Sequence, residues 1–163
     1  MEKSEGCQEE EIGRVTAVCI SEKKGRRKVP VPAITLRAGY GVVGDAHGGS
    51  ERQVSLLSQE SIEKMRRLGV EAGEGDFAEN ITIFGAALHL LPIGSVLRIG
   101  DKVRLRVTQI GKECHSACEI RTITGCCIMP EEGVFAEVLQ GGEVKAGDEV
   151  RLERLLQVCP AHP

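Results

Sequence analysis

Aromatic side chains are scarce in this sequence. The chain of 163 residues has four of them and no tryptophan; they are Tyr40, Phe77, Phe84 and Phe135. Proteins that bind single-stranded nucleic acid stack bases on several aromatic rings and also offer a basic surface. This chain instead has 24 acidic and 21 basic residues, a net charge of -3. A nucleic-acid partner is therefore not expected.

Long apolar runs and a secretion signal are also missing. No segment approaches the roughly 18 consecutive apolar residues that a membrane-spanning helix needs, so no membrane association is expected. Residues 1–11 contain five glutamates and no apolar stretch, unlike a signal peptide. The seven cysteines are an odd number, which favours a reduced, cytoplasmic protein over a secreted disulfide framework. They are Cys7, Cys19, Cys114, Cys118, Cys126, Cys127 and Cys159.

The length predicts one domain with a short tail at each end. Domains average roughly 150 residues, and a chain of this size can bury a core without disulfides or metals. The acidic residues 1–11 are predicted to form a flexible tail. Residues 12–155 are predicted to form the single domain, and residues 156–163 a C-terminal tail.

Glycine is abundant, which favours a turn-rich β protein. It contributes 20 residues, about 12% of the chain, whereas roughly 7% is usual. Short apolar or alternating segments predict strands at residues 12–21, 34–36, 53–57 and 80–84. One helix is predicted at residues 59–68, with Ser58 as its N-cap and Gly69 after its end. Its apolar face holds Ile62 and Met65.

A short motif occurs twice and predicts two hairpins. The pattern Gly-Asp-x-Val-Arg-Leu spans residues 100–105 and again residues 147–152. Gly-Asp between two apolar segments is typical of a two-residue hairpin turn, so each copy is predicted to be an antiparallel hairpin. Two hairpins and several other short strands favour a closed or nearly closed barrel, which leaves few exposed strand edges. The predicted fold class is therefore mostly β and barrel-like, with one or a few short helices.

Four cysteines and a histidine gather between residues 111 and 130, in a stretch that its glycines and proline mark as a loop. They are Cys114, His115, Cys118, Cys126 and Cys127. One interpretation is a reactive thiolate at Cys118, because Lys112, His115 and Arg121 supply positive charge nearby. A second is a non-catalytic module that binds zinc or senses redox state, and a third is plain burial. The zinc or redox module would use Cys114, His115, Cys118 and Cys127.

A glycine-rich stretch offers a second candidate site. It reads Gly44-Asp45-Ala46-His47-Gly48-Gly49 and is followed by Arg52. The glycines could allow backbone amides to face an anion, and Arg52 could pair with a phosphate or a carboxylate. The alternative is a hairpin in which the side chains of Asp45 and His47 bond the turn itself.

Two further segments also have open roles. Glu79 and Asn80 follow a glycine-rich turn, and they either orient a ligand or cap that turn. The basic run from Lys23 to Lys28 is predicted to be a mobile hairpin tip that only steers anions over a distance.

In combination, these segments resemble the MOSC family, which is named after the C-terminal domain of molybdenum cofactor sulfurase. The similarity is to its small stand-alone bacterial and archaeal branch and extends from about Ile12 to Leu155. The motifs that carry it are Gly44-Asp45-x-His47-x-Gly49 with Arg52-Gln53-Val54-Ser55, Phe77-Ala78-Glu79-Asn80, Leu91-Pro92-Ile93-Gly94, Gly111-Lys112-Glu113-Cys114-His115-x-x-Cys118, Cys127-Ile128-Met129-Pro130-x-x-Gly133-Val134-Phe135-Ala136, and Gly141-Gly142 with Gly147-Asp148. Each motif alone is weak, but six in this order are specific.

The resemblance implies a β-barrel of the pyruvate-kinase type with a functional cysteine. In the family this cysteine is taken to bind molybdenum of the pterin cofactor or to carry sulfur as a persulfide. Cys118 matches its position and would be the molybdenum ligand, with Cys114 as the rival and His115 as a further catalytic candidate. The residues expected to bind molybdenum cofactor (molybdopterin) are Gly44, Asp45, His47, Gly49, Arg52, Glu79, Asn80, Lys112 and Arg121.

The resemblance also implies partners. The activity would be sulfur transfer or a reaction that depends on molybdenum cofactor. No pyridoxal phosphate site is expected, because the eukaryotic sulfurase holds that group in a separate domain for which this chain has no room. We therefore expect a separate sulfur donor, such as a cysteine desulfurase, and a molybdoenzyme that accepts the sulfur.

Overall fold

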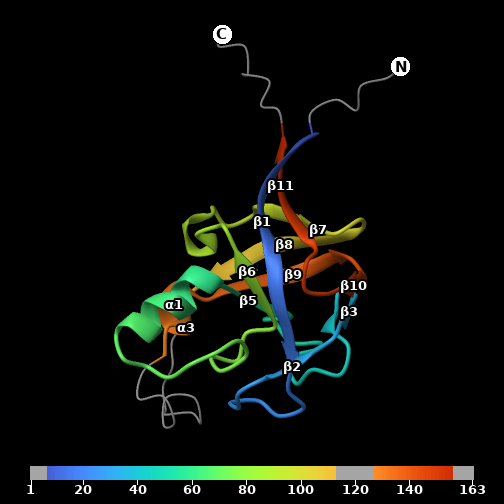
Figure 1. The fold of residues 1–163 in the computed structure, drawn as a ribbon. Helices are drawn as coiled ribbons and strands as arrows, with labels where there is room; N and C mark the ends of the chain where they lie inside the picture. Colours follow the sequence, from blue (N-terminus) through green and yellow to red (C-terminus); the bar gives the residue numbers. More distant parts are fainter. Residues whose placement is uncertain (1–6, 113–126, 156–163) are drawn as a thin grey trace, which may run out of the picture.

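The computed structural model describes residues 7–112 and 127–155. Its strands are β1 (Cys7–Ile20), β2 (Val29–Val31), β3 (Ile34–Arg37), β4 (Gly41–Val42), β5 (Val54–Ser58), β6 (Ile81–Phe84), β7 (Val96–Ile99), β8 (Val103–Ile110), β9 (Val134–Gln140), β10 (Gly142–Val144) and β11 (Glu149–Leu155). Its helices are α1 (Gln59–Arg67), α3 (Met129–Glu132) and the single 3-10 turn η1 (Leu88–Leu90). Strands predominate, as Figure 1 shows.

Seven strands close into a barrel. Their order around it is β1, β11, β7, β8, β9, β5 and β6, and β6 pairs with β1 again. β5 and β6 run parallel, whereas the other neighbours in this ring are antiparallel. β2 adds to the end of β1, and β10, β3 and β4 form a small separate sheet. The predicted mostly β, barrel-like fold is confirmed.

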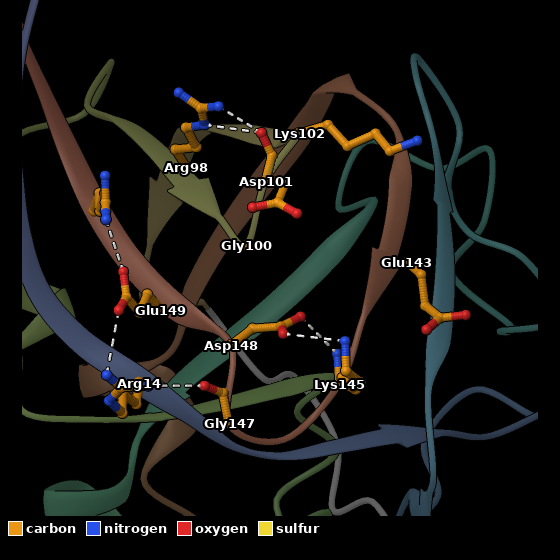
Figure 2. Close-up of a pocket in the computed structure, with 11 residues that line it drawn as sticks. Arg14, Arg98, Gly100, Asp101, Lys102, Glu143, Lys145, Gly147, Asp148 and Glu149 are labelled. Carbon is orange, nitrogen blue, oxygen red and sulfur yellow. Dashed lines mark hydrogen bonds and ion pairs between the residues drawn. The ribbon is translucent and has the colours of Figure 1, made fainter.

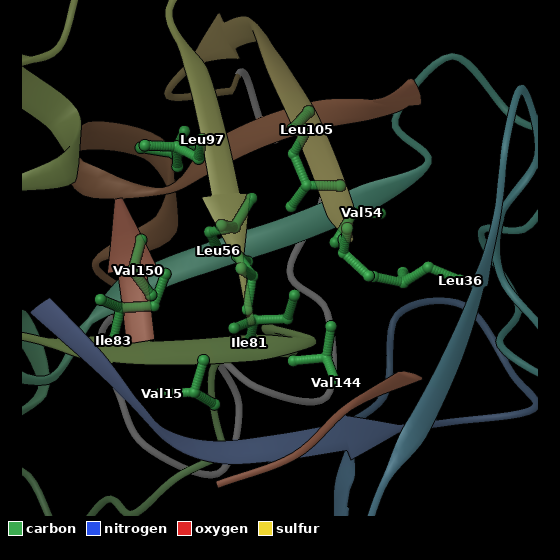
Figure 3. Close-up of a cluster of buried hydrophobic side chains, with 14 of the residues drawn as sticks. Val15, Leu36, Val54, Leu56, Ile81, Ile83, Leu97, Leu105, Val144 and Val150 are labelled. Carbon is green, nitrogen blue, oxygen red and sulfur yellow. The ribbon is translucent and has the colours of Figure 1, made fainter. Parts of the chain in front are cut away.

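Apolar side chains fill the inside of the barrel. Figure 3 shows Val15, Leu56, Ile83, Leu97 and Val150 meeting there from five different strands. A second apolar cluster packs α1 and α3 against the outside of β5; its buried members are Leu57, Ile62, Met65, Ala72, Phe77, Ile128, Met129 and Phe135. Both faces of β5 are therefore buried, because successive side chains of a strand point to opposite faces.

The predicted helix is present as α1, between β5 and Gly69. Ile62 and Met65 are buried as expected, whereas Leu68 after the helix is 71% exposed. Ser58 stands at the N-cap position, but its hydroxyl does not cap the helix. It donates to Ala86 O at 2.6 Å and accepts from Leu88 N at 3.1 Å, so it fastens η1 to the barrel instead. Within residues 7–112 and 127–155, no helix is long and apolar enough to cross a membrane.

The two copies of the repeated motif lie on either side of β7. Ile99 of β7 is opposite Val103 on one side and Val150 on the other. Two positions earlier in β7, Leu97 is likewise opposite Leu105 and Leu152. The copies therefore occupy equivalent registers in the barrel, and their apolar residues face the same core.

Only the first copy is a hairpin, so the prediction of two hairpins is corrected. β7 and β8 pair across the turn at Gly100 and Asp101. In the second copy, β10 pairs with β3 rather than with β11. The cause is the long strand β1: Gly147 N donates to Val15 O at 2.7 Å, and Val15 N donates to Asp148 O at 2.9 Å. These bonds direct β11 into the barrel beside β1.

The expected boundary between tail and domain also differs from the structure. β1 begins at Cys7, so residues 7–11 are not a flexible tail but pair with the end of β11. One of their acidic side chains, Glu9, has partners on two other strands. Glu9 accepts from Arg98 at 2.8 Å and lies 3.5 Å from Arg151. Neutralisation by these arginines explains why an acidic stretch is held in a strand. Residues 156–163 lie outside the described part of the chain.

Candidate functional site

Asp45 organises the glycine-rich loop of residues 44–49. Its side chain is fully shielded from solvent and accepts three hydrogen bonds. Oδ1 accepts from Lys28 Nζ at 2.7 Å and from Ser21 N at 3.0 Å, and Oδ2 accepts from His47 N at 3.1 Å. The Lys28 ammonium and the two amides outweigh the opposing effect of burial and lower the pKa of Asp45. Asp45 is therefore a buried carboxylate that bonds its own loop.

The backbone amides of this loop are engaged within the protein. The amide of Ala46 donates to Ser21 O, that of Gly48 to Asp45 O, and that of Gly49 to Tyr40 O. The amides of Asp45 and Ser50 also donate to carbonyls, and that of His47 donates to Asp45. Gly44 and Gly49 adopt the left-handed conformation, with φ of 86° and 77°. Since residues 45–50 use their amides internally, an anion here would be held by side chains rather than by a backbone nest.

His47 is a half-buried imidazole on which the charges of three lysines act. Burial is the main reason that its pKa falls to about 4. The charges of Lys28, Lys24 and Lys112 lower this pKa further, and Asp45 opposes them. His47 is therefore neutral at physiological pH, and lysines from two segments, the basic loop and the end of β8, act on it with their positive charge.

Lys28 was expected in a mobile loop, and this expectation is corrected. Its side chain is 1% exposed and forms the ion pair with Asp45 described above. Its backbone N also donates to Gly75 O at 2.8 Å. Lys23, Lys24, Arg26 and Arg27 before it are exposed, in agreement with a solvated loop. The basic run is thus an exposed loop whose last residue is anchored in the protein.

Glu79 and Asn80 are both fully buried and bond neighbouring segments. Glu79 accepts from the amides of Gly75 and Phe77, and burial raises its pKa to about 8. The side chain of Asn80 accepts from Ser55 N at 3.0 Å and donates to Cys19 O at 3.1 Å. Glu79 therefore caps the turn, which is the alternative that the sequence left open, and Asn80 joins β5 to β1.

Arg52 and Lys112 are each held by a contact with another part of the fold. The guanidinium of Arg52 lies over the ring of Phe135, 5.6 Å from its centroid, a cation–π geometry. Lys112 follows β8, and its backbone N donates to Pro130 O at 3.2 Å. Lys112 is thus tied to α3 and is close enough to His47 to lower its pKa.

Most of the predicted cysteine cluster lies outside the described residues. Cys114, His115, Cys118, Arg121 and Cys126 fall in residues 113–126, for which the structure gives no description. Two described residues border that segment: Lys112, and Cys127, which is partly buried against the second apolar cluster. Among the residues that the structure describes, no three His, Cys, Asp or Glu side chains are grouped so that they could hold a metal ion.

Cys19 has the surroundings of an unreactive thiol. It is fully buried in β1, within the strand that the sequence predicted at residues 12–21. Burial is the main cause that raises its pKa to about 12, and the carboxylates of Glu79 and Glu74 add to it. A thiol with so high a pKa has almost no thiolate near neutral pH.

A separate hollow of about 510 Å³ lies where the two Gly-Asp turns meet, as Figure 2 shows. Its lining carries five basic and four acidic side chains, and most of them pair with one another. Arg14 donates to Gly147 O and Glu149, while Asp148 bonds Lys145. None of the loop residues 44–49 lines this hollow, and neither does Lys112. It is therefore distinct from the candidate site around His47.

Comparison with known protein families identifies the family of this chain. The sequence matches the MOSC domain over residues 43–151, a range that includes the His47 loop and most of the barrel. The chain belongs to the MOSC family. A search among curated proteins finds no significant match to this MOSC chain.

The MOSC barrel is similar to crystal structures of small bacterial proteins. YuaD from Bacillus subtilis aligns with a TM-score of 0.75 and 17% identity over 91% of this chain and 98% of that protein. YiiM from Geobacillus stearothermophilus aligns at 0.58 and 18%, over 89% and 75% of the two chains. YiiM from Escherichia coli aligns at 0.59 and 17%, over 85% and 69%. At these identities the similarity concerns the fold.

Sequence reasoning did not place Lys28 at the candidate site around His47. It treated Lys28 as one of several equivalent charges in a basic run. The signal available was its position directly before Val29-Pro30-Val31, an apolar segment that pairs with β1. A lysine at the start of a strand can fold its side chain back into the protein, but only a known partner makes that prediction specific. Asp45 lies 17 residues further along the chain.

Proposed function

We propose that this MOSC protein binds molybdenum cofactor, or a related phosphate-bearing pterin, beside the loop of residues 44–49. The observation that carries the proposal is the convergence of Lys24, Lys112 and a neutral His47 in a chain of the MOSC family. Lys112 is the last described residue before the segment that contains Cys114 and Cys118. Lys112 would therefore hold a ligand at a point of the chain that directly precedes the candidate thiols.

The residues present fit the phosphate end of such a ligand through their side chains. Lys24 and Lys112 supply positive charge, and neutral His47 supplies a hydrogen-bond partner without adding charge. Arg52 can add a planar guanidinium, which suits phosphate geometry. Lys28 does not join them, since Asp45 neutralises its charge. When bound, the cofactor would supply a metal centre with sulfur and oxygen ligands.

We further propose that Cys118 binds the metal or carries sulfur as a persulfide, with Cys114 as the rival. A thiolate is the reactive form of cysteine, and nearby positive charge stabilises it. In the carrier role, the Cys118 thiolate attacks the outer sulfur of a persulfide on the donor. The donor's sulfur–sulfur bond breaks, the donor leaves as a thiolate, and Cys118 becomes the persulfide. A cysteine desulfurase is the expected class of donor, and a molybdoenzyme the expected class of acceptor.

Purification from two hosts tests the proposal, one able and one unable to make molybdenum cofactor. The protein from the competent host should contain molybdenum and a pterin that fluoresces after oxidation, and the protein from the deficient host should contain neither. When sulfur is carried, peptide mass analysis should show an adduct of about 32 Da on Cys118 that a thiol reductant removes, unlike the two oxygens of a sulfinic acid. Stoichiometric zinc that is the same from both hosts, with no pterin and no adduct, would contradict the proposal and favour a zinc module.

A further inference from the structure

The ion pair of Lys28 and Asp45 connects three segments of the chain. Lys28 ends the exposed basic loop, and its backbone is bound to the turn at Gly75. Asp45 lies in the glycine-rich loop and accepts from Ser21, at the end of β1. The 2.7 Å bond between Nζ and Oδ1 therefore fixes the two loops relative to each other and to the barrel.

The same carboxylate also determines where His47 lies. While Oδ1 of Asp45 bonds Lys28, Oδ2 accepts from the backbone N of His47 at 3.1 Å. Ala46, between them, donates its amide to Ser21 O at 2.8 Å. The backbone on the N-terminal side of His47 is thus held by Asp45 and by β1, and Lys28 holds Asp45.

Stability alone does not account for a pair placed this way. Both side chains are almost fully shielded from water, at 1% and 0% exposure. Removing two charges from water is costly, and apolar side chains of similar volume often give equal or greater stability. What apolar side chains cannot provide is an acceptor for the His47 amide, which donates to the carboxylate of Asp45.

We propose that the Lys28–Asp45 pair is a positioning element of the ligand site. Lys28 does not touch the ligand; it orients Asp45, and Asp45 places His47 beside Lys24 and Lys112. This inference rests on the proposed function for the identity of the ligand. The placement of His47 can be measured without any ligand.

Three variants separate positioning from stability: Lys28→Met, Asp45→Leu, which keeps the branched shape of Asp but has no acceptor for the His47 amide, and the double variant. Each single change leaves one buried charge without its partner, whereas the double variant removes both charges. The double variant should therefore recover stability in urea unfolding relative to the single variants. The ion pair of Lys145 and Asp148, in which the lysine is exposed and the aspartate partly buried, supplies the control, as Lys145→Met with Asp148→Leu.

The deciding readouts are amide hydrogen exchange at His47 and the affinity for inorganic phosphate. If the pair positions His47, the His47 amide of the folded double variant should still exchange faster than that of the wild-type protein. Its phosphate affinity should fall about tenfold or more, as when partners that orient a ligand-binding group are lost. The control double variant should change neither readout. Recovery of both wild-type values in the Lys28–Asp45 double variant would overturn the inference.

Two outcomes keep this test separate from the proposed function. If the wild-type protein binds no phosphate, the proposed function loses support, and exchange at His47 still decides the inference. If the variants do not fold, the wild-type protein decides it alone. The His47 amide should then exchange as slowly as that of Ser21, because both donate to Asp45. Exchange at His47 as fast as in an exposed loop would overturn the inference.

Discussion

Lys28 Nζ lies 2.7 Å from Asp45 Oδ1, and both side chains of this ion pair are shielded from solvent. Replacing one member leaves the other as a buried charge without a partner. We expect Lys28→Met to lower the free energy of unfolding by about 3–5 kcal/mol. Urea unfolding followed by circular dichroism measures this difference.

The control for Lys28→Met is Lys24→Met, in the same loop. Lys24 is exposed, and substitutions at exposed positions usually change stability by about 0.5 kcal/mol or less. Equal effects of the two changes would show that Lys28 is as solvated as its neighbours, contrary to the ion pair described above.

Burial of Glu79 predicts a stability that falls as pH rises. Its pKa is raised to about 8 in the folded protein, against 4.5 for the free side chain. The folded state therefore binds more protons than the unfolded state between these values. Its contribution is fully present below the unfolded pKa and is lost as pH rises toward the folded pKa.

Glu79→Gln removes this titration but leaves one of the two turn amides, of Gly75 or Phe77, facing an NH₂ group. The variant should be less stable than the wild type at about pH 5, and the difference should shrink toward about pH 8. Urea unfolding at several pH values measures it, with exposed Glu143→Gln as the control. A difference that stays constant or grows with pH would argue that Glu79 is ionised in the fold.

The titration of His47 predicts a pH dependence of stability of the opposite sign. Its pKa is about 4 in the folded protein and 6.5 for the free side chain, so the folded state favours the neutral imidazole. This contribution to stability is present above the unfolded pKa and is lost as pH falls toward about 4. The NMR titration of the His47 ring should therefore have its midpoint near 4, and a midpoint close to 6.5 would rule out the buried, lysine-lined environment.

Gly48 leaves room for the ring of Tyr40. A Cβ at Gly48 would lie 2.6 Å from two carbons of that ring and from the hydroxyl oxygen of Tyr40. The guanidinium of Arg37 lies over the same ring, 4.1 Å from its centroid. We expect Gly48→Ala to destabilise the protein by about 1–3 kcal/mol through overpacking. Thermal unfolding measures the loss.

Gly73→Ala is the matched control for Gly48→Ala, because its added Cβ would meet its nearest neighbour at an ordinary 3.7 Å. In a Tyr40→Ala background, Gly48→Ala should cost less than in the wild type. A cost that does not depend on residue 40 would mean that the ring is not the cause.

The barrel could be predicted from the sequence because its signals are local. Alternating apolar residues gave β5, β6 and the β7–β8 hairpin, and the apolar spacing of Ile62 and Met65 gave α1. The prediction of a second hairpin was wrong because β10 pairs with β3 and β11 pairs with β1. These partners are distant in sequence, and a local turn signal carries no information about them.

The candidate site was harder to predict from the sequence for the same reason. The residue types at positions 44–49 drew attention to the loop, but the role of Asp45 depends on Lys28 and Ser21, which are distant in sequence. Glu79 and Asn80 were candidates for ligand binding by motif, whereas their hydrogen bonds join the Gly75 turn, β5 and β1. The cysteine segment stays a prediction from sequence.

The central claim is that an anionic pterin is held by side chains around His47, with Lys112 among them. The most direct test compares pterin content in Lys112→Ala and Lys102→Ala, both purified from a host that makes molybdenum cofactor. Lys102 is an exposed lysine in the separate hollow at the Gly-Asp turns. The account predicts that Lys112→Ala retains about a tenth or less of the wild-type pterin, a loss of at least 1.4 kcal/mol in binding, and that Lys102→Ala retains all of it. Equal pterin content in Lys112→Ala and the wild-type protein would contradict the account.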